Sequence, residues 1–288
     1  MHRVYRWLLL VLLVQLTACS STTFFYNRLH FLVPWYLGGY VDLEQPQRQY
    51  LDELLATFLH QHRREELPRY VDILSQATAM LDREIAVADL AALYSEAEQA
   101  ADRLQAGALE WLLALGAELS DEQIRGLITE LRDRQEEYRD QYLARDDRQY
   151  RSDAYDSLRK NARKYLGRLD SSQRQQLQRA SGELKRSDGA WLDSRQAWID
   201  YLEQILQRQP GWQRQLREAM AERAERNSPE YRDAFGHNLA VIQAALADLL
   251  NSRSERQDRH LRRELQKLHS ELHKLAEQGG AYIPPKES

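Results

Sequence analysis

Apolar residues recur along this chain at the spacing of an α-helix. Between residues 50 and 59, tyrosine, leucine and phenylalanine side chains fall three and four positions apart and would line one helical face. Similar stripes, ending in two narrow leucine seams, occupy residues 109–115, 127–142, 191–206, 239–249 and 261–275. The pattern predicts an all-α fold whose last two helices form an antiparallel hairpin or a coiled-coil arm.

Few residues interrupt this helical pattern. The 288 residues include only 12 Gly and 7 Pro, and the 46 Leu and 31 Ala outnumber the 22 Val, Ile and Thr combined. This composition favours helices over strands and argues against a doubly wound nucleotide-binding fold. Neither Gly nor Pro occurs in residues 69–106, 127–166 or 237–278. A continuous helix of about 40 residues would span about 60 Å, so we expect an elongated bundle of long helices.

Three copies of a Leu-x-x-x-Gln pattern mark expected helix starts. They occupy Leu43–Gln47, Leu119–Gln123 and Leu169–Gln173. In the second and third copies, Ser120 and Asp170 can cap the first turn while the glutamine reaches back to the backbone of the cap residue. The alternative is a repeated ligand-binding motif. The pattern also resembles the Leu-Thr-x-x-Gln signature of small periplasmic helical chaperones and metal-stress sensors, with Glu44, Ser120 and Asp170 in place of threonine.

The first 23 residues have the pattern of a secreted, lipid-modified protein. Basic residues precede an apolar run from Trp7 to Val14, which is far shorter than the roughly 20 residues needed to cross a bilayer and is typical of a signal peptide. The segment Leu16–Cys19 resembles the lipobox of bacterial lipoproteins. The resemblance implies removal of residues 1–18, acylation of Cys19 and a short tether over residues 19–23. It also implies the periplasmic face of the outer membrane, because the residue after the cysteine is Ser20 and not Asp.

An aromatic segment follows the tether. Ten of the fourteen residues from Phe24 to Leu37 are Phe, Tyr, Trp, Leu or Val, and the segment begins five residues after Cys19. One interpretation places it at the membrane interface, where aromatic side chains gather. The other makes it the first helix of the bundle core, and we favour this second interpretation.

The first candidate binding site lies in residues 62–70 and consists of His62, Arg63, Glu66 and Tyr70. His62 and Glu66 are four residues apart and share a helical face, as two metal ligands would. A zinc site needs three or four convergent ligands, and no third ligand is evident, so we predict no metal. We interpret the four residues as a polar network over a turn at Pro68.

A second candidate site is basic. Arg159 and Arg163, each followed by a lysine, place four cations on adjacent helical faces. These cations could bind the phosphate groups of lipid A or an acidic polymer. The interpretation that we favour pairs them with acids of the same chain, such as Asp153 and Asp156.

The third candidate site combines indoles with a cation. Trp191, Arg195 and Trp198 follow one another at spacings of four and three residues and therefore share a helical face. A guanidinium between two indoles can stack on both, and such a face could hold a sugar or a peptide. We favour a packed core in which Arg195 pairs with an acid.

Several of these segments together resemble a known family. The similarity rests on Tyr26–Leu29, Pro34–Tyr36, Tyr40–Leu43, Gln47 and His62–Tyr70, with further matches at residues 159–167 and at Trp191, Arg195 and Trp198. With the lipobox, these residues resemble a family of uncharacterised proteobacterial lipoproteins, domain of unknown function 6279. The resemblance implies a helical envelope lipoprotein and supplies no activity.

The sequence favours binding over catalysis. It contains no Gly-x-Ser-x-Gly elbow, Gly-rich phosphate loop or paired-histidine protease motif, and its only cysteine is the expected acylation site. A net charge of −4 argues against nucleic acid as a partner. We expect one bundle over residues 24–278 and a disordered tail over 279–288. Its expected role is non-enzymatic and needs no cofactor, as a scaffold, binding or chaperone-like protein for envelope proteins or peptides. The alternative is a module that binds envelope glycan or lipid A phosphate through the basic face.

Overall fold

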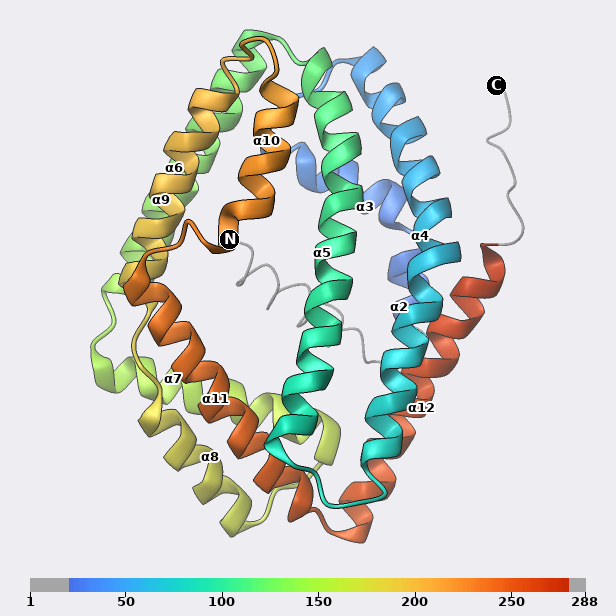
Figure 1. The fold of residues 1–288 in the computed structure, drawn as a ribbon, viewed down its shortest axis with the longest axis vertical. Coiled ribbons are helices and arrows are strands. Elements are labelled where there is room, and N and C mark those ends of the chain that lie inside the picture. The colour runs from blue at the N-terminus through green and yellow to red at the C-terminus, as the bar shows by residue number, and fades with distance from the viewer. Residues whose placement is uncertain (1–20, 280–288) are drawn as a thin grey trace. The chain divides into compact units, whose positions relative to one another are not determined.

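The computed structural model describes residues 21–279 (Figure 1). Within this range the chain forms eleven α-helices, one short 3-10 helix and no strand, which confirms the all-α prediction. The α-helices are α2 (Ser21–Tyr26), α3 (Leu29–Leu37), α4 (Gln45–Met80), α5 (Val87–Glu118), α6 (Asp121–Leu143), α7 (Asp147–Leu166), α8 (Ser171–Glu183), α9 (Asp188–Ile205), α10 (Trp212–Ala221), α11 (Pro229–Asn251) and α12 (Glu255–Gln278). The expected signal peptide, the expected lipidation site Cys19 and residues 280–288 of the expected tail lie outside the described residues.

The described chain divides into two compact units. Unit 1 consists of residues 21–82, 92–123 and 262–279, and unit 2 consists of residues 83–91 and 124–261. The chain passes from one unit to the other within α5, α6 and α12. The residues predicted as a C-terminal hairpin form α11 and α12.

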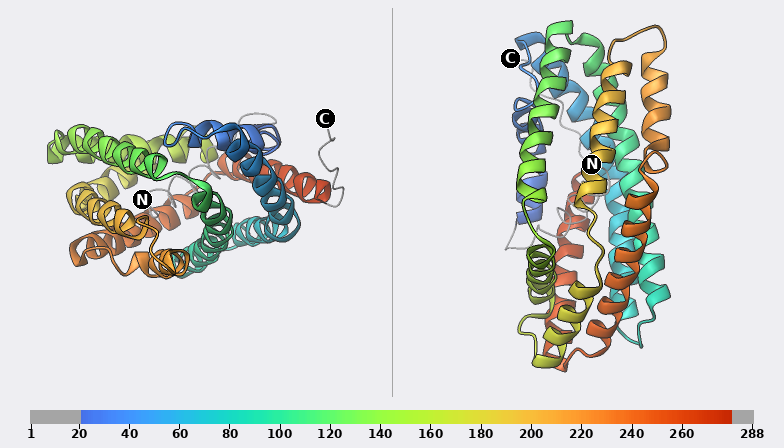
Figure 2. Two further views of the ribbon diagram at one scale, coloured as in Figure 1. Left: turned by 90° about the horizontal axis from the view of Figure 1, so that it is seen from above. Right: turned by 90° about the vertical axis from the view of Figure 1, so that its left-hand side faces the viewer.

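Unit 1 is organised around α4. Figures 1 and 2 show α5 and the later part of α12 beside α4, with α2 and α3 lying along it. Their shared core contains Leu67 and Tyr70 of α4, Ala100 of α5 and Leu268, Leu272 and Leu275 of α12. Leucines of the apolar stripe predicted over residues 261–275 therefore face this core from α12.

The aromatic segment lies on the outside of unit 1. No residue of α3 is buried, and Phe31 and Trp35 are 63% and 71% exposed. The expectation that residues 24–37 form the first core helix is therefore wrong. The burial falls instead on Thr22 and in part on Tyr26, which packs against the core of unit 1.

A proline does not always mark a helix boundary in this chain. Helix α4 continues through Pro68, where the sequence predicted a turn. A proline inside a helix leaves the carbonyl four residues earlier without its backbone donor. Pro68 lies on the exposed side of α4, where water can supply the missing hydrogen bond. The loss of stability caused by Pro68 is therefore small, and the buried neighbours Leu67 and Tyr70 keep α4 continuous.

Long helices are present, but each of the three stretches without Gly or Pro is broken and none forms one continuous helix of about 40 residues. The breaks fall at residues 81–86, 144–146 and 252–254. A polar side chain caps the chain after each break. Asp89 accepts a hydrogen bond from the Ala86 amide at 2.9 Å, and Asp146 accepts one from the Gln149 amide at 2.7 Å. Ser254 and Gln257 form a capping box, which supplies a helix start without any breaker.

The three predicted helix starts are confirmed. In each one the glutamine side chain accepts a hydrogen bond from the backbone amide of the cap residue: Glu44 at 2.8 Å, Ser120 at 2.8 Å and Asp170 at 3.1 Å. The first two starts also contact each other in unit 1, because the amides of Gln47 and Gln123 are mutually hydrogen-bonded at 3.0 and 2.7 Å. The motif therefore joins helices as well as beginning them.

Unit 2 contains two packed groups of helices. Helix α8 contacts both α7 and α11, and α9 contacts α10 and α11 (Figure 2). A buried cluster of Trp191, Leu192 and Tyr231 joins α9 to α11, and Tyr138 and Tyr142 of α6 pack against it. Trp191 of the third candidate site thus belongs to the core of unit 2, as the favoured interpretation predicted.

Candidate functional site

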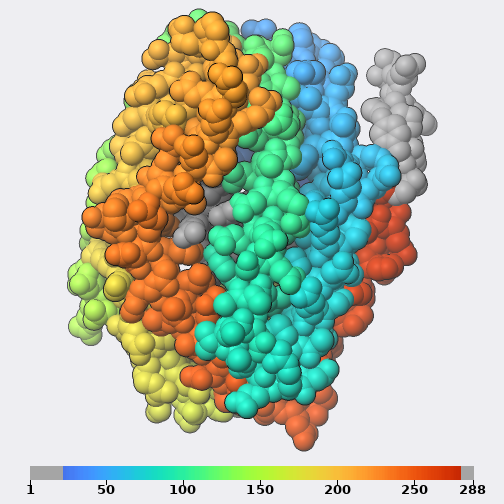
Figure 3. Space-filling view, in the orientation of Figure 1, coloured from blue at the N-terminus to red at the C-terminus, as the bar shows by residue number. Residues whose placement is uncertain are grey.

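One candidate site is a groove in unit 1. It lies between α4 and α5, which adjoin along one face of the molecule (Figure 3), and its volume is about 810 Å³. Tyr50, Phe58 and Trp111 supply its aromatic surface, and the rings of Phe58 and Trp111 are 6.4 Å apart. Gly107 lets the Phe58 ring approach α5, because a Cβ at that position would lie 3.0 Å from the ring.

The lining of the groove is acidic. Four carboxylates, those of Glu53, Glu65, Glu66 and Glu110, face one guanidinium, that of Arg103. The Nε of Arg103 lies 3.0 Å from both carboxylate oxygens of Glu66, whose side chain is only 13% exposed. This pair offsets one charge of each sign, so the remaining carboxylates give the groove a net negative charge.

His62 lines the groove and is locked by two tyrosines. Tyr26 Oη lies 2.8 Å from His62 Nδ1, and Tyr70 Oη lies 3.1 Å from His62 Nε2. A neutral imidazole satisfies both contacts, because one ring nitrogen accepts a hydrogen bond while the other donates one. The ring therefore fixes α2 against α4 and supports the wall of the groove.

Burial keeps this triad uncharged. Desolvation, aided by the positive charge of Arg63, lowers the pKa of His62 from 6.5 to about 4. Desolvation raises the pKa of Tyr26 to about 12, against the opposing effect of Arg63. Desolvation and the nearby Glu66 carboxylate raise the pKa of Tyr70 above its ordinary value. All three side chains are neutral at pH 7, and their hydrogen bonds have a structural role.

The four residues of the first predicted site lie in one region but have separate partners. His62 bonds to Tyr70, as the predicted polar network requires. Arg63 donates instead to Asn27 Oδ1 at 2.8 Å, and Glu66 pairs with arginines of α4 and α5. Among the described residues, no group of three or more His, Cys, Asp or Glu side chains could hold a metal ion.

The basic site lies on α7. Arg159 pairs with Asp156 at 2.9 Å, which is one of the two acids expected from the sequence. The other, Asp153, pairs with Arg145. Arg163 is exposed in the last turn of α7, where a cation is favourably placed against the helix dipole.

The predicted indole site is divided between two places in unit 2. Arg195 is only 3% exposed, and its guanidinium lies 4.9 Å from the Tyr138 ring and 6.0 Å from the Trp191 ring. Trp198 is covered by another cation, Arg223, at 4.2 Å. The alternative in which Arg195 stacks between two tryptophans is therefore wrong, because the second ring is Tyr138. In the favoured packed core an acid was expected to pair with Arg195, and at Nη1 the partner is instead the amide of Gln135.

The hydrogen bonds of Arg195 make this region a buried network. Its Nη1 donates to Gln135 Oε1 at 2.6 Å, and Gln135 Nε2 donates to the Leu192 carbonyl at 2.9 Å. Gln135 is fully buried. The sequence did not single out Gln135, since a glutamine in a charged helix carries no signal of burial. The packed-core interpretation describes Trp191 and Arg195 better than an open sugar or peptide face does.

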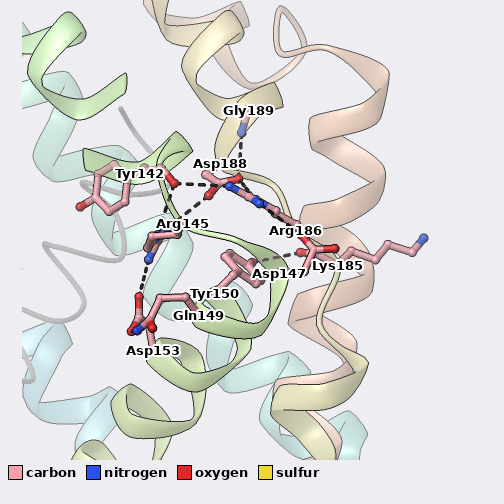
Figure 4. A network of polar contacts seen from close by, with 10 residues as sticks. All are labelled: Tyr142, Arg145, Asp147, Gln149, Tyr150, Asp153, Lys185, Arg186, Asp188 and Gly189. Atoms are coloured by element: carbon pink, nitrogen blue, oxygen red, sulfur yellow. Dashed lines mark hydrogen bonds and ion pairs between the residues drawn. The ribbon is translucent and has the colours of Figure 1, made fainter. Parts of the chain in front are cut away.

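A second network in unit 2 was not predicted (Figure 4). Asp188, at the first turn of α9, accepts from Arg186 at 2.8 Å and from Arg145 at 3.2 Å. Arg145 also pairs with Asp153, and Arg186 with Asp147. Each charge faces a charge of opposite sign, so the network ties the α6–α7 and α8–α9 connections together. It was missed because its two halves lie about 40 residues apart and no local pattern links them.

Comparison with known proteins identifies a family. Residues 39–232 match a family of unknown function, DUF6279, and this range includes most of the residues on which the resemblance in sequence was based. Comparisons with curated proteins and with solved structures found no match.

Proposed function

The chain belongs to DUF6279, a family of unknown function, and we propose that it is a lipid-anchored envelope protein that binds peptide segments of a partner protein in the α4–α5 groove. In this proposal, acylated Cys19 holds the protein on the periplasmic face of the outer membrane. The protein acts as a scaffold or chaperone-like binding protein and catalyses no reaction.

The groove of unit 1 is the observation that carries this proposal. Its volume of about 810 Å³ is in the range of sites that hold a small ligand, and it would accept a few side chains of a peptide. Aromatic side chains at its surface suit apolar side chains of a ligand, and the excess of carboxylates suits lysine or arginine. A segment that alternates basic and apolar residues has the matching chemistry.

The structure around His62 supports binding rather than proton transfer. Both ring nitrogens already face tyrosine hydroxyls, and the pKa of about 4 makes the imidazole a weak base near neutral pH. The tyrosine pKa values are raised, so neither hydroxyl is poised as a base. The wall is thus preformed, which lowers the entropy cost of binding.

Charge reversal in the groove tests the proposal. The probe is a fluorescent amphipathic peptide of lysine and leucine, and a glutamate and leucine peptide of equal length is the control ligand. We expect the lysine peptide to bind and the variant Glu53→Lys/Glu110→Lys to weaken its binding at least about tenfold, since two attractive charges become repulsive.

The control variant is Asp52→Lys/Asp72→Lys. Both aspartates are exposed on α4 and outside the groove, and the change in net charge is the same. Equal loss of binding in both double variants, with both still folded, would show that the peptide does not use the groove. In cells, a photo-crosslinker at Thr57 should capture envelope proteins, and one at Asp72 should not.

The anchor is tested independently. Mass spectrometry of the mature protein from membranes should find an acylated N-terminal Cys19, and Cys19→Ser should release the protein from the membrane fraction. An unmodified N-terminus at Met1 would refute the anchor without bearing on the groove.

A second candidate ligand is an anionic envelope polymer or lipid A phosphate bound by α7. The observation in its favour is that Lys160 and Arg163 are both exposed one turn apart. This candidate predicts salt-sensitive binding to isolated lipopolysaccharide that weakens in Arg163→Glu. Unchanged binding in that variant would exclude it.

A further inference from the structure

Helices α2 and α3 present a cluster of exposed aromatic side chains, which we call the aromatic face. It consists of Phe24, Phe25, Phe31, Trp35 and Tyr36, whose exposed fractions run from 45% to 71%. They account for five of the ten large hydrophobic side chains that are exposed among the described residues. So many large aromatics in one short segment mark an interaction surface rather than ordinary scatter.

The same segment is held firmly to unit 1 by its other side. Thr22 is 1% exposed, and Tyr26 both bonds to His62 and packs against the unit 1 core. Asn27 accepts a hydrogen bond from Arg63 of α4. The aromatic face is therefore not a loose end of the chain, because a fixed inner side holds it in place.

The chemistry of the aromatic face matches a lipid surface. No Asp or Glu occurs from residue 21 to residue 41, whereas Arg28 and His30 are exposed beside the aromatic rings. The Arg28 guanidinium lies 3.8 Å from the Phe24 ring. Tryptophan and tyrosine prefer the boundary between headgroups and acyl chains, and a nearby cation is attracted to anionic headgroups. Among the described residues no helix is long and apolar enough to cross a membrane, so this segment would lie along the surface.

We propose that the aromatic face inserts into the membrane interface and forms a second attachment beside the acylated cysteine. The choice of a bilayer as the occupant rests on the proposed anchor, since helix α2 begins only two residues after Cys19 in the sequence. Two attachments fix the orientation of unit 1 at the membrane, whereas acyl chains on a tether alone leave it free to rotate. Amphipathic surface segments of this kind bind by burying apolar area and by attraction to anionic lipid.

The test uses the mature chain, residues 19–288, with Cys19→Ser. Acylation is then absent, and the protein has no cysteine left, because Cys19 is the only one. We expect this protein to float with vesicles of phosphatidylethanolamine and phosphatidylglycerol. The variant Phe31→Ser/Trp35→Ser should lower its partition into vesicles at least about tenfold, since two large apolar groups are lost from the buried area. Leu112→Ser/Leu246→Ser is the matched control, because these two leucines are exposed on other helices.

A dye locates the contact. An environment-sensitive fluorophore on Phe31→Cys should shift to the blue when vesicles are added, and the same dye on Leu112→Cys should not. Absence of the shift, or equal vesicle binding by both serine double variants, overturns the proposal. A shift that depends on protein concentration and not on vesicles would assign the face to a second copy of the chain and also overturns it. A missing acyl group on Cys19 would refute the anchor but could not change this assay.

Discussion

The side-chain amides of Gln173 and Gln257 are hydrogen-bonded to each other in both directions, at 3.0 and 2.8 Å. Each oxygen also accepts from the backbone of its own helix cap, Asp170 or Ser254. Gln257 further donates to the Arg168 carbonyl, at the start of the partner helix. Gln47 and Gln123 repeat this arrangement in unit 1. The same arrangement therefore occurs twice in the fold: the glutamine side chains of two capping boxes are hydrogen-bonded to each other.

The amide pair should be a cooperative element of stability. Gln173 is fully buried, and Gln173→Leu removes its two hydrogen bonds with the Gln257 amide and the one it accepts from the Asp170 backbone, so it should lower the free energy of unfolding by about 2 kcal/mol. Urea denaturation measures this loss. The double variant Gln173→Leu/Gln257→Leu should cost less than the sum of the single variants. The exposed Gln175→Leu is the control. Additive losses would show that the two amides do not act as a pair.

Acid should destabilise the protein in part through His62. The folded protein binds this proton only near pH 4, whereas the unfolded chain binds it near pH 6.5, so stability is fully present above pH 6.5 and is lost as pH falls. The imidazole should account for a loss of about 2 kcal/mol between about pH 7 and about pH 5. His62→Gln removes this part of the pH dependence, and denaturant unfolding at both pH values measures it. The exposed His30→Gln should keep the wild-type slope. The same slope in His62→Gln and wild type would contradict this account.

Asp188 should matter far more than its neighbour Asp147. The Asp188 side chain is 8% exposed and joins two arginines, so Asp188→Ala leaves partly buried cations without their shared partner. We expect a loss of about 3 kcal/mol in the free energy of unfolding. Asp147 has a 70% exposed side chain, and Asp147→Ala should cost less than about 1 kcal/mol. Equal effects in thermal or chemical unfolding would show that the network contributes nothing beyond surface pairing.

Replacement of Pro68 should stabilise the protein. Alanine restores the backbone donor to the carbonyl of Arg64 and removes the steric conflict of a proline ring inside α4. Pro68 is exposed, so little packing is lost. The greater freedom of the unfolded chain opposes part of this gain, and the expected net increase is about 1 kcal/mol in the free energy of unfolding. A decrease for Pro68→Ala would show that the proline makes a contact on which α4 depends.

Helix content, three of the helix starts and the apolar stripes were predictable from the sequence, because each depends on residues that lie close together in the chain. The capping pattern at Glu44, Ser120 and Asp170 is an example. A fourth capping box of the same kind, at Ser254, was missed because Arg253 stands where the other copies have leucine. The breaks in the long stretches contain no Gly or Pro. Polar side chains that cap the start of the following helix mark them instead.

The candidate site was predictable only in part. Spacing placed His62 and Tyr70 together, but it gave no sign that Tyr26 completes the triad from 36 residues away. The groove needs Trp111 and Arg103 from α5, which no local pattern connects with Phe58 of α4. The arrangement of the indole site was not predictable for the same reason, since Arg195 stacks on Tyr138 of α6.

The sequence by itself determined that the chain is helical, where three of the helices begin and which stripes are apolar. Only the tertiary structure decided which polar groups are buried and with whom they pair. Burial and pairing depend on helices brought together from distant parts of the chain, and a glutamine or arginine looks the same in sequence whether it faces water or a partner. The aromatic face is the opposite case. The sequence predicted that this apolar segment lies in the core, and in the structure its aromatic side chains are exposed.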